Sequence, residues 1–360
     1  MRKRTFALSI CGILLVGLAS AEWLVRMRAH SRYGEFLDIY DFHEPVPELD
    51  ILIPSPNLSI EFAGQTHIDT DSHGFRSPEL EHPKPAGSLR IAFLGGSTSF
   101  CSQASSNEST WPHLVTDKLR ADLTGLEVEY LNAGVTGYRT THSTRNMRAR
   151  VAPLKPDLVI IYHGTNDLAV DSKELAIAAG LASTFEPSWL ADNSLLWHLI
   201  QKNRRWMASQ SAGKSNSDKL ELDVSALAEV FRTHLTQLVQ TAQAGSQLVA
   251  LVTFSAKVRR EQALEVQLEN LQQSFSFMSY LSSEDIMTGY EAYNRVIEEV
   301  ATQTGALLIP AADAIPPDAK HFADSVHLTD AGCEALAIQV HATLKVAPRL
   351  QELIARLKTD

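Results

Sequence analysis

Five residues spread over four short segments have the chemical types that acyl transfer through a serine ester requires. Ser97 could supply the nucleophile, while His327 and Asp324 could supply a general base and the carboxylate that orients it. Gly137 and Asn166 lie in segments that could offer hydrogen-bond donors to a developing oxyanion. Alone, the segments of Ser97 and Asn166 also suit ordinary turns, and that of Asp324 and His327 suits the N-terminal flank of a helix. Only a fold that gathers all four would make a site.

An alternation of apolar runs and helical patterns predicts how these segments come together. Short apolar runs of the kind buried in a parallel sheet occupy residues 90–94, 128–131, 158–162, 248–253 and 306–309. Helical patterns occupy residues 111–123, 141–151, 224–244, 289–304 and 329–344. We therefore predict a three-layer α/β/α fold, flavodoxin-like, with a doubly wound parallel sheet of five strands.

The candidate residues follow the strand ends in this scheme. Ser97, Gly137 and Asn166 each come after one of the first three strands, and His327 comes after the fifth strand and a longer loop. Ligand sites in such sheets lie outside the carboxyl ends of the strands, which share one edge. We expect the four segments to converge at that edge.

The four segments resemble blocks I, II, III and V of the SGNH hydrolases, also called the GDSL family, over about residues 88–345. The resemblance implies that Ser97 is the nucleophile and that Asp324 and His327 are its partners. It also implies an oxyanion hole made by the backbone N–H groups of Ser97 and Gly137 and by the side-chain amide of Asn166. No cofactor and no metal are implied.

Gly96 departs from the family pattern, because the GDSL signature has an aspartate before the serine. That aspartate is not the nucleophile, so the departure concerns support of the loop. Two neighbouring polar residues have simpler interpretations. We expect His163 to be a hydrogen-bonded loop histidine and Asp167 to anchor the turn after the third strand.

The first 28 residues predict a signal anchor that forms a transmembrane helix. Basic residues at positions 2–4 precede an uncharged run from Thr5 to Ala21, and Glu22 interrupts the apolar pattern before it resumes. Residues 6–25 are just long enough to span a bilayer, and the basic leader would stay cytoplasmic. The expected location is a bacterial inner membrane, with a single pass and a periplasmic catalytic domain. A secreted protein cleaved after Ala21 is the alternative.

Residues 29–87 predict an extended arm, because prolines recur from Pro45 to Pro85 and exclude a long helix. The arm, with its run Gly74-Phe75-Arg76, resembles that of bacterial membrane-tethered family members. Residues 88–360 would form the SGNH hydrolase-type domain. Within it, residues 168–223 look like an insertion, either a lid or an extra packing element.

The net charge excludes one class of function, and the cysteines raise the question of a disulfide. A net charge of −10 argues against nucleic-acid binding, which needs clustered Lys and Arg. The three cysteines are Cys11, Cys101 and Cys333. Cys101 and Cys333 follow the candidate nucleophile and histidine closely and could pair outside the cytoplasm. Two unrelated buried thiols is the interpretation that we favour.

The leading interpretation is a serine ester hydrolase that acts outside the cytoplasm on acyl or acetyl esters of glycans or lipids. An O-acyltransferase that modifies an envelope polysaccharide with the same serine is the first alternative. A catalytically silent binding protein is the second, although a binding role does not need all five candidate residues. The residues leave hydrolysis and transfer both open.

Overall fold

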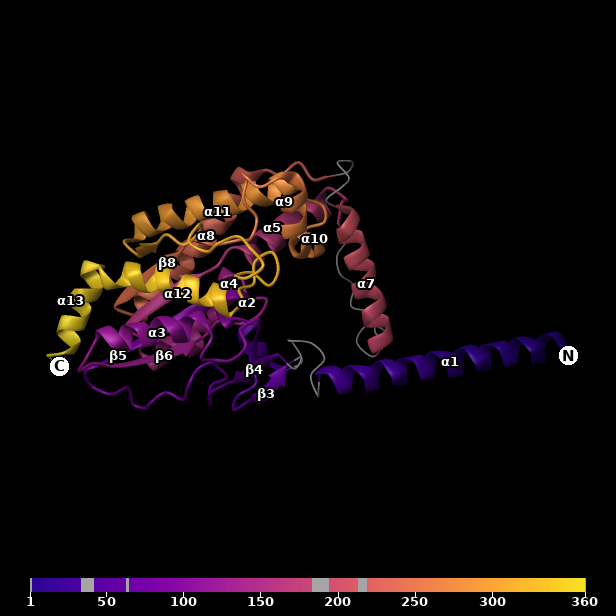
Figure 1. Ribbon diagram of the computed structural model, residues 1–360, viewed down its shortest axis with the longest axis horizontal. Helices are drawn as coiled ribbons and strands as arrows, with labels where there is room; N and C mark the ends of the chain where they lie inside the picture. Colours follow the sequence, from indigo (N-terminus) through magenta and orange to yellow (C-terminus); the bar gives the residue numbers. More distant parts are fainter. Residues whose placement is uncertain (1, 34–41, 63–64, 183–193, 213–218, 360) are drawn as a thin grey trace.

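A five-stranded parallel sheet forms the centre of the computed structural model, which describes residues 2–33, 42–62, 65–182, 194–212 and 219–359 (Figure 1). Its strands are β5 (Ser88–Gly95), β6 (Glu127–Asn132), β7 (Leu158–Tyr162), β8 (Leu248–Val252) and β9 (Leu307–Ile309). Their spatial order is β6-β5-β7-β8-β9, and every neighbouring pair is parallel. This is the flavodoxin-like order. The predicted three-layer fold and its five strands are confirmed.

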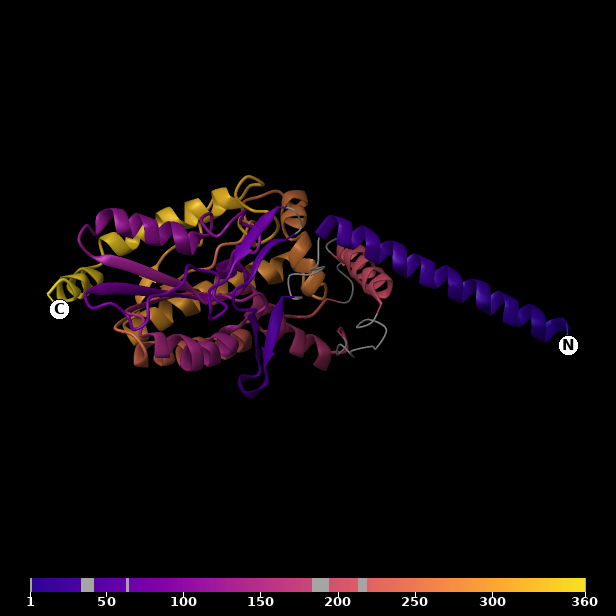
Figure 2. The same cartoon turned by 90° about the horizontal axis from the view of Figure 1, so that it is seen from below.

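Helices cover both faces of the sheet. One layer contains α3 (Trp111–Asp122) and α12 (Asp330–Lys345), which pack against each other. The other contains α4 (Thr140–Asn146), α5 (Thr165–Ala178), α8 (Val224–Ala244) and α11 (Ser283–Thr304). Figure 2 shows purple α3 and yellow α12 on one side of the sheet, with the other layer opposite. Because β5, β7 and β8 are covered on both faces, all their residues are buried, as continuous apolar runs predict.

Strand register aligns the ends of the central strands at one edge. Gly95 at the end of β5 lies opposite Tyr162 at the end of β7, and Phe93 lies opposite Asn132 at the end of β6. The loops after these three strands therefore leave the sheet together. Those loops carry Ser97, Gly137 and the start of α5.

Shorter helices complete the domain. They are α2 (Ser97–Phe100), a π-helical turn (Met147–Val151), a 3₁₀ turn (Ala152–Leu154), α9 (Leu264–Asn270), α10 (Gln272–Phe277) and α13 (Pro348–Leu357). The predicted start of α11 at Gly289 was wrong by six positions. Ser282 and Asp285 form a capping box that begins the helix earlier, and Gly289 is buried inside it. A Cβ at Gly289 would lie 2.8 Å from the Leu168 side chain, so the glycine permits close packing rather than ending the helix.

The region before β5 contains two antiparallel hairpins. They are formed by β1 (His43–Val46) with β2 (Ile51–Pro54), and by β3 (Ser59–Phe62) with β4 (Thr66–Asp69); a 3₁₀ turn (Pro47–Leu49) joins the first pair. The first hairpin packs on the loop after β6, where the Tyr138 hydroxyl donates to the Leu52 carbonyl at 2.5 Å. The second contributes Ile68 to a small cluster with Phe100 of α2. This part of the chain thus lies against the loops at the carboxyl edge of the sheet.

The N-terminal helix α1 spans Arg2–Tyr33 and extends away from the domain (Figure 1). Within the described part of the chain, no helix combines the length and the apolar character needed to cross a membrane. The predicted transmembrane helix at residues 1–28 is therefore not supported. Glu22, which interrupts the apolar run, accepts hydrogen bonds from the backbone N–H groups of Leu195 and Leu196, both at 2.9 Å. It thereby caps α7 (Leu195–Ala212).

The predicted insertion at residues 168–223 is only partly irregular. Residues 168–178 belong to α5, which begins at Thr165, and residues 195–212 form α7. Residues 183–193 and 213–218 of the insertion lie outside the described residues. Helix α7 packs against α10 and α1. In the described residues, α7 therefore connects the N-terminal helix to the domain.

Candidate active site

Ser97 lies where β5 gives way to α2, on the first residue of that four-residue helix. Gly96 precedes it in an extended conformation and acts as the helix N-cap residue. The Ser97 side-chain oxygen lies 2.8 Å from Nε2 of His327, although 230 residues separate them in the chain. The structure therefore brings Ser97 and His327 together, as the sequence predicts.

Asp324 orients His327 within a tight loop between β9 and α12. The Asp324 carboxylate accepts a hydrogen bond from Nδ1 of His327 at 2.7 Å and from its backbone N–H at 2.9 Å. A backbone bond from Ala323 N–H to the His327 carbonyl closes the loop. Burial opposes ionisation of Asp324, but the hydrogen bonds and the charge of His327 outweigh it and lower the pKa. This carboxylate therefore favours the tautomer whose Nε2 can accept the Ser97 proton.

The loop of Gly137 and the start of α5 meet beside Gly96, the residue before Ser97. Gly137 has φ of +81°, a backbone region that favours glycine, so the loop turns sharply here. Asn166 lies in the first turn of α5, and its side-chain N–H₂ donates to the Tyr138 carbonyl at 3.0 Å. The amide has a second N–H. A Cβ at Gly96 would lie 2.7 Å from the Asn166 amide nitrogen, so the absent side chain at position 96 lets this amide approach.

Asp167 ties the loops of Gly137 and Asn166 to each other. Its Oδ1 accepts hydrogen bonds from the Thr140 backbone N–H at 3.0 Å and from the Thr140 hydroxyl at 2.7 Å. Burial raises the pKa of Asp167 to about 7, although the Thr140 bonds act in the opposite direction. The prediction that Asp167 anchors the turn is confirmed. Its partner Thr140 was not singled out, since nothing marks it except a hydroxyl at the start of a helix.

His163 is a structural residue, as predicted. Its side chain is 2% exposed and its Nε2 lies 2.8 Å from the Ser143 hydroxyl. Burial lowers the pKa of His163 to about 3, so the ring is neutral at ordinary pH. His163 bonds Ser143, and the histidine that contacts Ser97 is His327.

Cys101 and Cys333 are both buried and free. A hydrogen bond with Cys101, followed by burial, raises the pKa of Cys333. The two buried thiols therefore form no disulfide, as in the interpretation that we favoured. The side chain of Cys11 lies outside the described residues. Within the described parts of the chain, no group of three or more His, Cys, Asp or Glu side chains is arranged to hold a metal ion.

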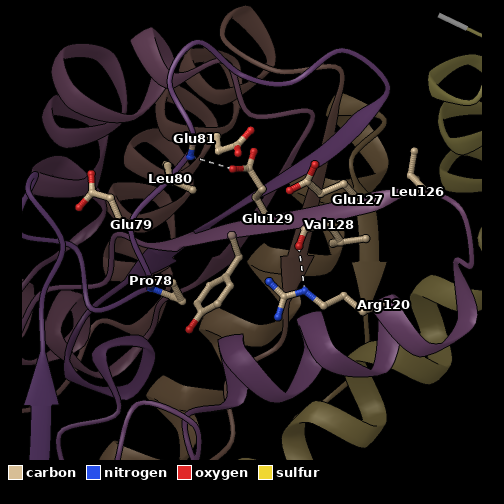
Figure 3. A pocket seen from close by; sticks show the side chains of 10 residues that line it. Pro78, Glu79, Leu80, Glu81, Arg120, Leu126, Glu127, Val128 and Glu129 are labelled. Atoms are coloured by element: carbon tan, nitrogen blue, oxygen red, sulfur yellow. Dashed lines mark hydrogen bonds between the residues drawn. The ribbon is translucent and has the colours of Figure 1, made fainter.

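Two hollows in the surface are lined by residues other than the Ser97 group. One, of about 380 Å³, lies along edge strand β6 and includes four glutamates, at positions 79, 81, 127 and 129 (Figure 3). In Figure 3, Glu129 accepts a hydrogen bond from the Glu81 N–H, and Arg120 donates to the Val128 carbonyl. The second, of about 310 Å³, lies beside the start of α12. Because Glu129 and Arg120 already bond within the protein, we assign the first hollow no ligand.

The fold and the arrangement of Ser97, His327 and Asp324 define a serine-hydrolase-like α/β/α protein. The model of the GDSL-like lipase/acylhydrolase family matches residues 93–335, so the chain belongs to that family and is an ester hydrolase. No curated protein has a sequence that matches the chain.

Several solved structures are similar in fold. One is the acetylxylan esterase Axe2 from Geobacillus stearothermophilus, with 17% identity over 72% of this chain and 95% of that chain, and a TM-score of 0.43. Another is LAE5, an alpha/beta hydrolase from the metagenome of Lake Arreo, Spain, with 16% identity over 72% and 96%, and a TM-score of 0.43.

Proposed function

We propose that the protein hydrolyses acyl or acetyl esters through a covalent acyl-enzyme on Ser97. The Ser97 oxygen attacks the ester carbonyl carbon while Nε2 of His327 takes its proton. His327 then protonates the leaving alcohol oxygen as the ester C–O bond breaks. A water molecule attacks the acyl carbonyl carbon and loses its proton to His327. As the acyl bond to the Ser97 oxygen breaks, His327 returns this proton to that oxygen, and the acid is released. The observation that carries this proposal is the pair of bonds at 2.8 and 2.7 Å that link Ser97, His327 and Asp324.

The oxyanion formed in each attack would be stabilised by three donors. They are the backbone N–H groups of Ser97 and Gly137 and the side-chain amide of Asn166. Within the described residues, neither backbone N–H has a hydrogen-bond acceptor. Donors that are free and fixed before the reaction stabilise developing charge without reorganisation.

Labelling of Ser97 by a fluorophosphonate probe tests the mechanism. We expect the wild-type protein to be labelled and to hydrolyse 4-nitrophenyl acetate, and Ser97→Ala to do neither. Ser102→Ala, a serine in the same loop, is the matched control and should still be labelled. An unlabelled wild-type protein, or a labelled Ser97→Ala variant, would contradict the proposal.

The acceptor of the acyl group separates hydrolysis from transfer. With an acetyl ester as donor, we expect release of free acetate even when a saccharide is present at high concentration. Acetylated saccharide as the main product would instead favour the O-acyltransferase.

We also propose that the catalytic domain acts outside the cytoplasm. Support comes from the basic residues at positions 2–4 and the uncharged run that follows. Ile13, Leu15 and Val16 of α1 are 71%, 68% and 68% exposed, an unusual arrangement for a helix in water. A C-terminal alkaline phosphatase fusion should be active in a bacterial host, and a reporter that works only in the cytoplasm, fused at the same point, should be inactive.

A further inference from the structure

We propose that Arg76, which precedes the family-matched region, is a positioning residue for the nucleophile. The proposal rests on the nucleophilic role proposed above for Ser97. Arg76 does not touch Ser97; it acts through the backbone of α2 and the residue that ends this helix.

A tight turn directs Arg76 into the protein. The Asp71 carboxylate accepts hydrogen bonds from the backbone N–H groups of His73 at 2.9 Å and Phe75 at 2.8 Å. Gly74 within the turn has φ of +78°, and a Cβ there would lie 2.2 Å from the Pro54 carbonyl oxygen. The turn is therefore fixed by the hairpin beside it. The Arg76 side chain that follows is fully buried.

The Arg76 guanidinium donates four hydrogen bonds, to the end of α2, to β4 and to the loop at Asn107. Nη1 donates to the carbonyls of Phe100 and Cys101 at 3.1 and 2.8 Å. Nη2 donates to the His67 carbonyl at 2.9 Å, and Nε donates to the Asn107 side-chain oxygen at 2.9 Å. Among the described residues, no carboxylate forms an ion pair with this buried cation. Its partners are almost all backbone carbonyls, which indicates that it serves to fix backbone.

The two carbonyls at the end of α2 belong to a strained segment. Cys101 has φ of 61° and ψ of 53°, a left-handed conformation that is unfavourable for residues other than glycine. Such conformations persist where the surroundings hold them in place. Arg76 bonds the carbonyl on each side of the Cys101 α-carbon, so it holds the strained residue directly.

The same segment is bonded to the nucleophile. The backbone N–H of Cys101 donates to the Ser97 carbonyl, and the N–H of Ser102 donates to it at 3.2 Å. A shift at residues 100–102 would therefore move Ser97 relative to His327, whose Nε2 is 2.8 Å away. Displacements of this kind reduce turnover more than binding, because attack requires close alignment of the reacting atoms. Arg76 thus reaches the nucleophile through two successive sets of backbone bonds.

Arg76→Lys tests the proposal, since lysine keeps the charge but loses the planar fork that reaches three carbonyls at once. With 4-nitrophenyl acetate, we expect kcat to fall at least tenfold while KM stays within about threefold. Fluorophosphonate labelling of Ser97 should slow by a similar factor. Asn107→Ala, which removes the acceptor that orients Nε, should shift both readouts in the same direction by a smaller factor.

Arg150→Lys is the matched control. Arg150 also contacts the turn, through the His73 carbonyl and the face of the Phe75 ring, but it has no contact with α2 among the bonds described. We expect it to lower Tm without changing kcat. If Arg76→Lys keeps normal kcat, or loses no more kcat than Arg150→Lys at an equal loss of Tm, the proposal is wrong.

Two further outcomes are distinguishable. If Arg76→Lys does not fold, Asn107→Ala decides, and unchanged kcat and labelling there would overturn the proposal. If the wild-type protein is not labelled at Ser97, the proposed mechanism itself is wrong. If the wild-type protein is labelled and Ser97→Ala is not, the mechanism stands, and the result for Arg76→Lys then bears on the role of Arg76 alone.

Discussion

At the level of single residues, the site depends on side chains that are absent as much as on those that are present. Gly96 replaces the aspartate of the family signature, and its missing Cβ leaves room for the Asn166 amide. Gly96 has φ of −91° and ψ of −150°, a conformation open to any residue. A substitution here should therefore disturb the Asn166 amide without straining the Gly96 backbone, although the Tyr138 carbonyl oxygen, 3.1 Å from the added Cβ, must also shift slightly.

Gly96→Ala is expected to reduce kcat by about 10²-fold with a small effect on KM, because it pushes the Asn166 amide from the oxyanion position. Asn166→Ala should cost a similar factor, about 2.7–4 kcal/mol of transition-state stabilisation. The double variant should lose little beyond either single one, since both remove the same donor. Steady-state kinetics on an aryl acetate measure all three. Fully additive losses, or normal kcat in Gly96→Ala, would exclude this role for Asn166.

Asp167 gives the site a pH-dependent stability. Its pKa is raised by burial from 3.8 to about 7, so between these values the folded protein holds a proton that the unfolded chain releases. Its contribution to stability is full below about pH 4 and is lost as pH rises through about 7. Asp167→Asn, which keeps an oxygen to accept from Thr140, should remove up to about 1.4 kcal/mol per pH unit of this dependence.

Thermal unfolding at pH 5 to 8 measures that effect for Asp167. The difference in Tm between Asp167→Asn and wild type should move in favour of the variant as pH rises. A constant difference across this range would show that Asp167 is ionised in the folded protein throughout.

At the level of elements, strands and long helices could be predicted because their apolar patterns are local. The end of α8 at Gly245 and the strand at Leu158–Tyr162 follow directly from such patterns. The start of α5 inside the third motif could not, because Asn166 and Asp167 favour turns as isolated residues. Packing against α8 and the bonds to Thr140 hold them in a helix instead.

The contact between α1 and α7 depends on Glu22. Burial opposes ionisation of Glu22, but hydrogen bonds from Leu195, Leu196, Ser194 and Arg26 outweigh it and lower the pKa to about 2. This stabilisation is present above the ordinary glutamate pKa and is lost as pH falls towards 2. Glu22→Ala should speed backbone hydrogen exchange at residues 195–197 about fivefold, as expected for losing a helix cap worth about 1 kcal/mol. Arg26→Gln is the control, and equal exchange rates in Glu22→Ala and wild type would contradict the capping role.

At the level of the whole molecule, the segment before β5 is part of the catalytic domain's support. Phe100 of α2 is buried under Phe42 and Ile68, and Arg76 bonds the end of the same helix. None of these contacts could be predicted from the sequence. Recurring prolines exclude a long helix but do not say what the chain packs against, and bonds to backbone carbonyls require no particular partner residue.

Truncation separates the two halves of the N-terminal region. A chain that begins at residue 42 should keep kcat within a few-fold of wild type, because it retains both hairpins and Arg76. A chain that begins at residue 88 should lose at least 10²-fold in kcat or fail to fold, since α2 loses its cover and its bonds. Equal activity in the two chains would show that residues 42–87 are dispensable.

The placement of Asp324 and His327 after the last strand also affects how the enzyme comes into being. A ribosome releases the chain from its beginning, so Ser97 emerges 230 residues before the imidazole that we propose as its base. A nascent or shortened polypeptide that ends before residue 324 carries the first three blocks and lacks the proposed base. The proposed esterase activity therefore requires that synthesis proceed beyond His327.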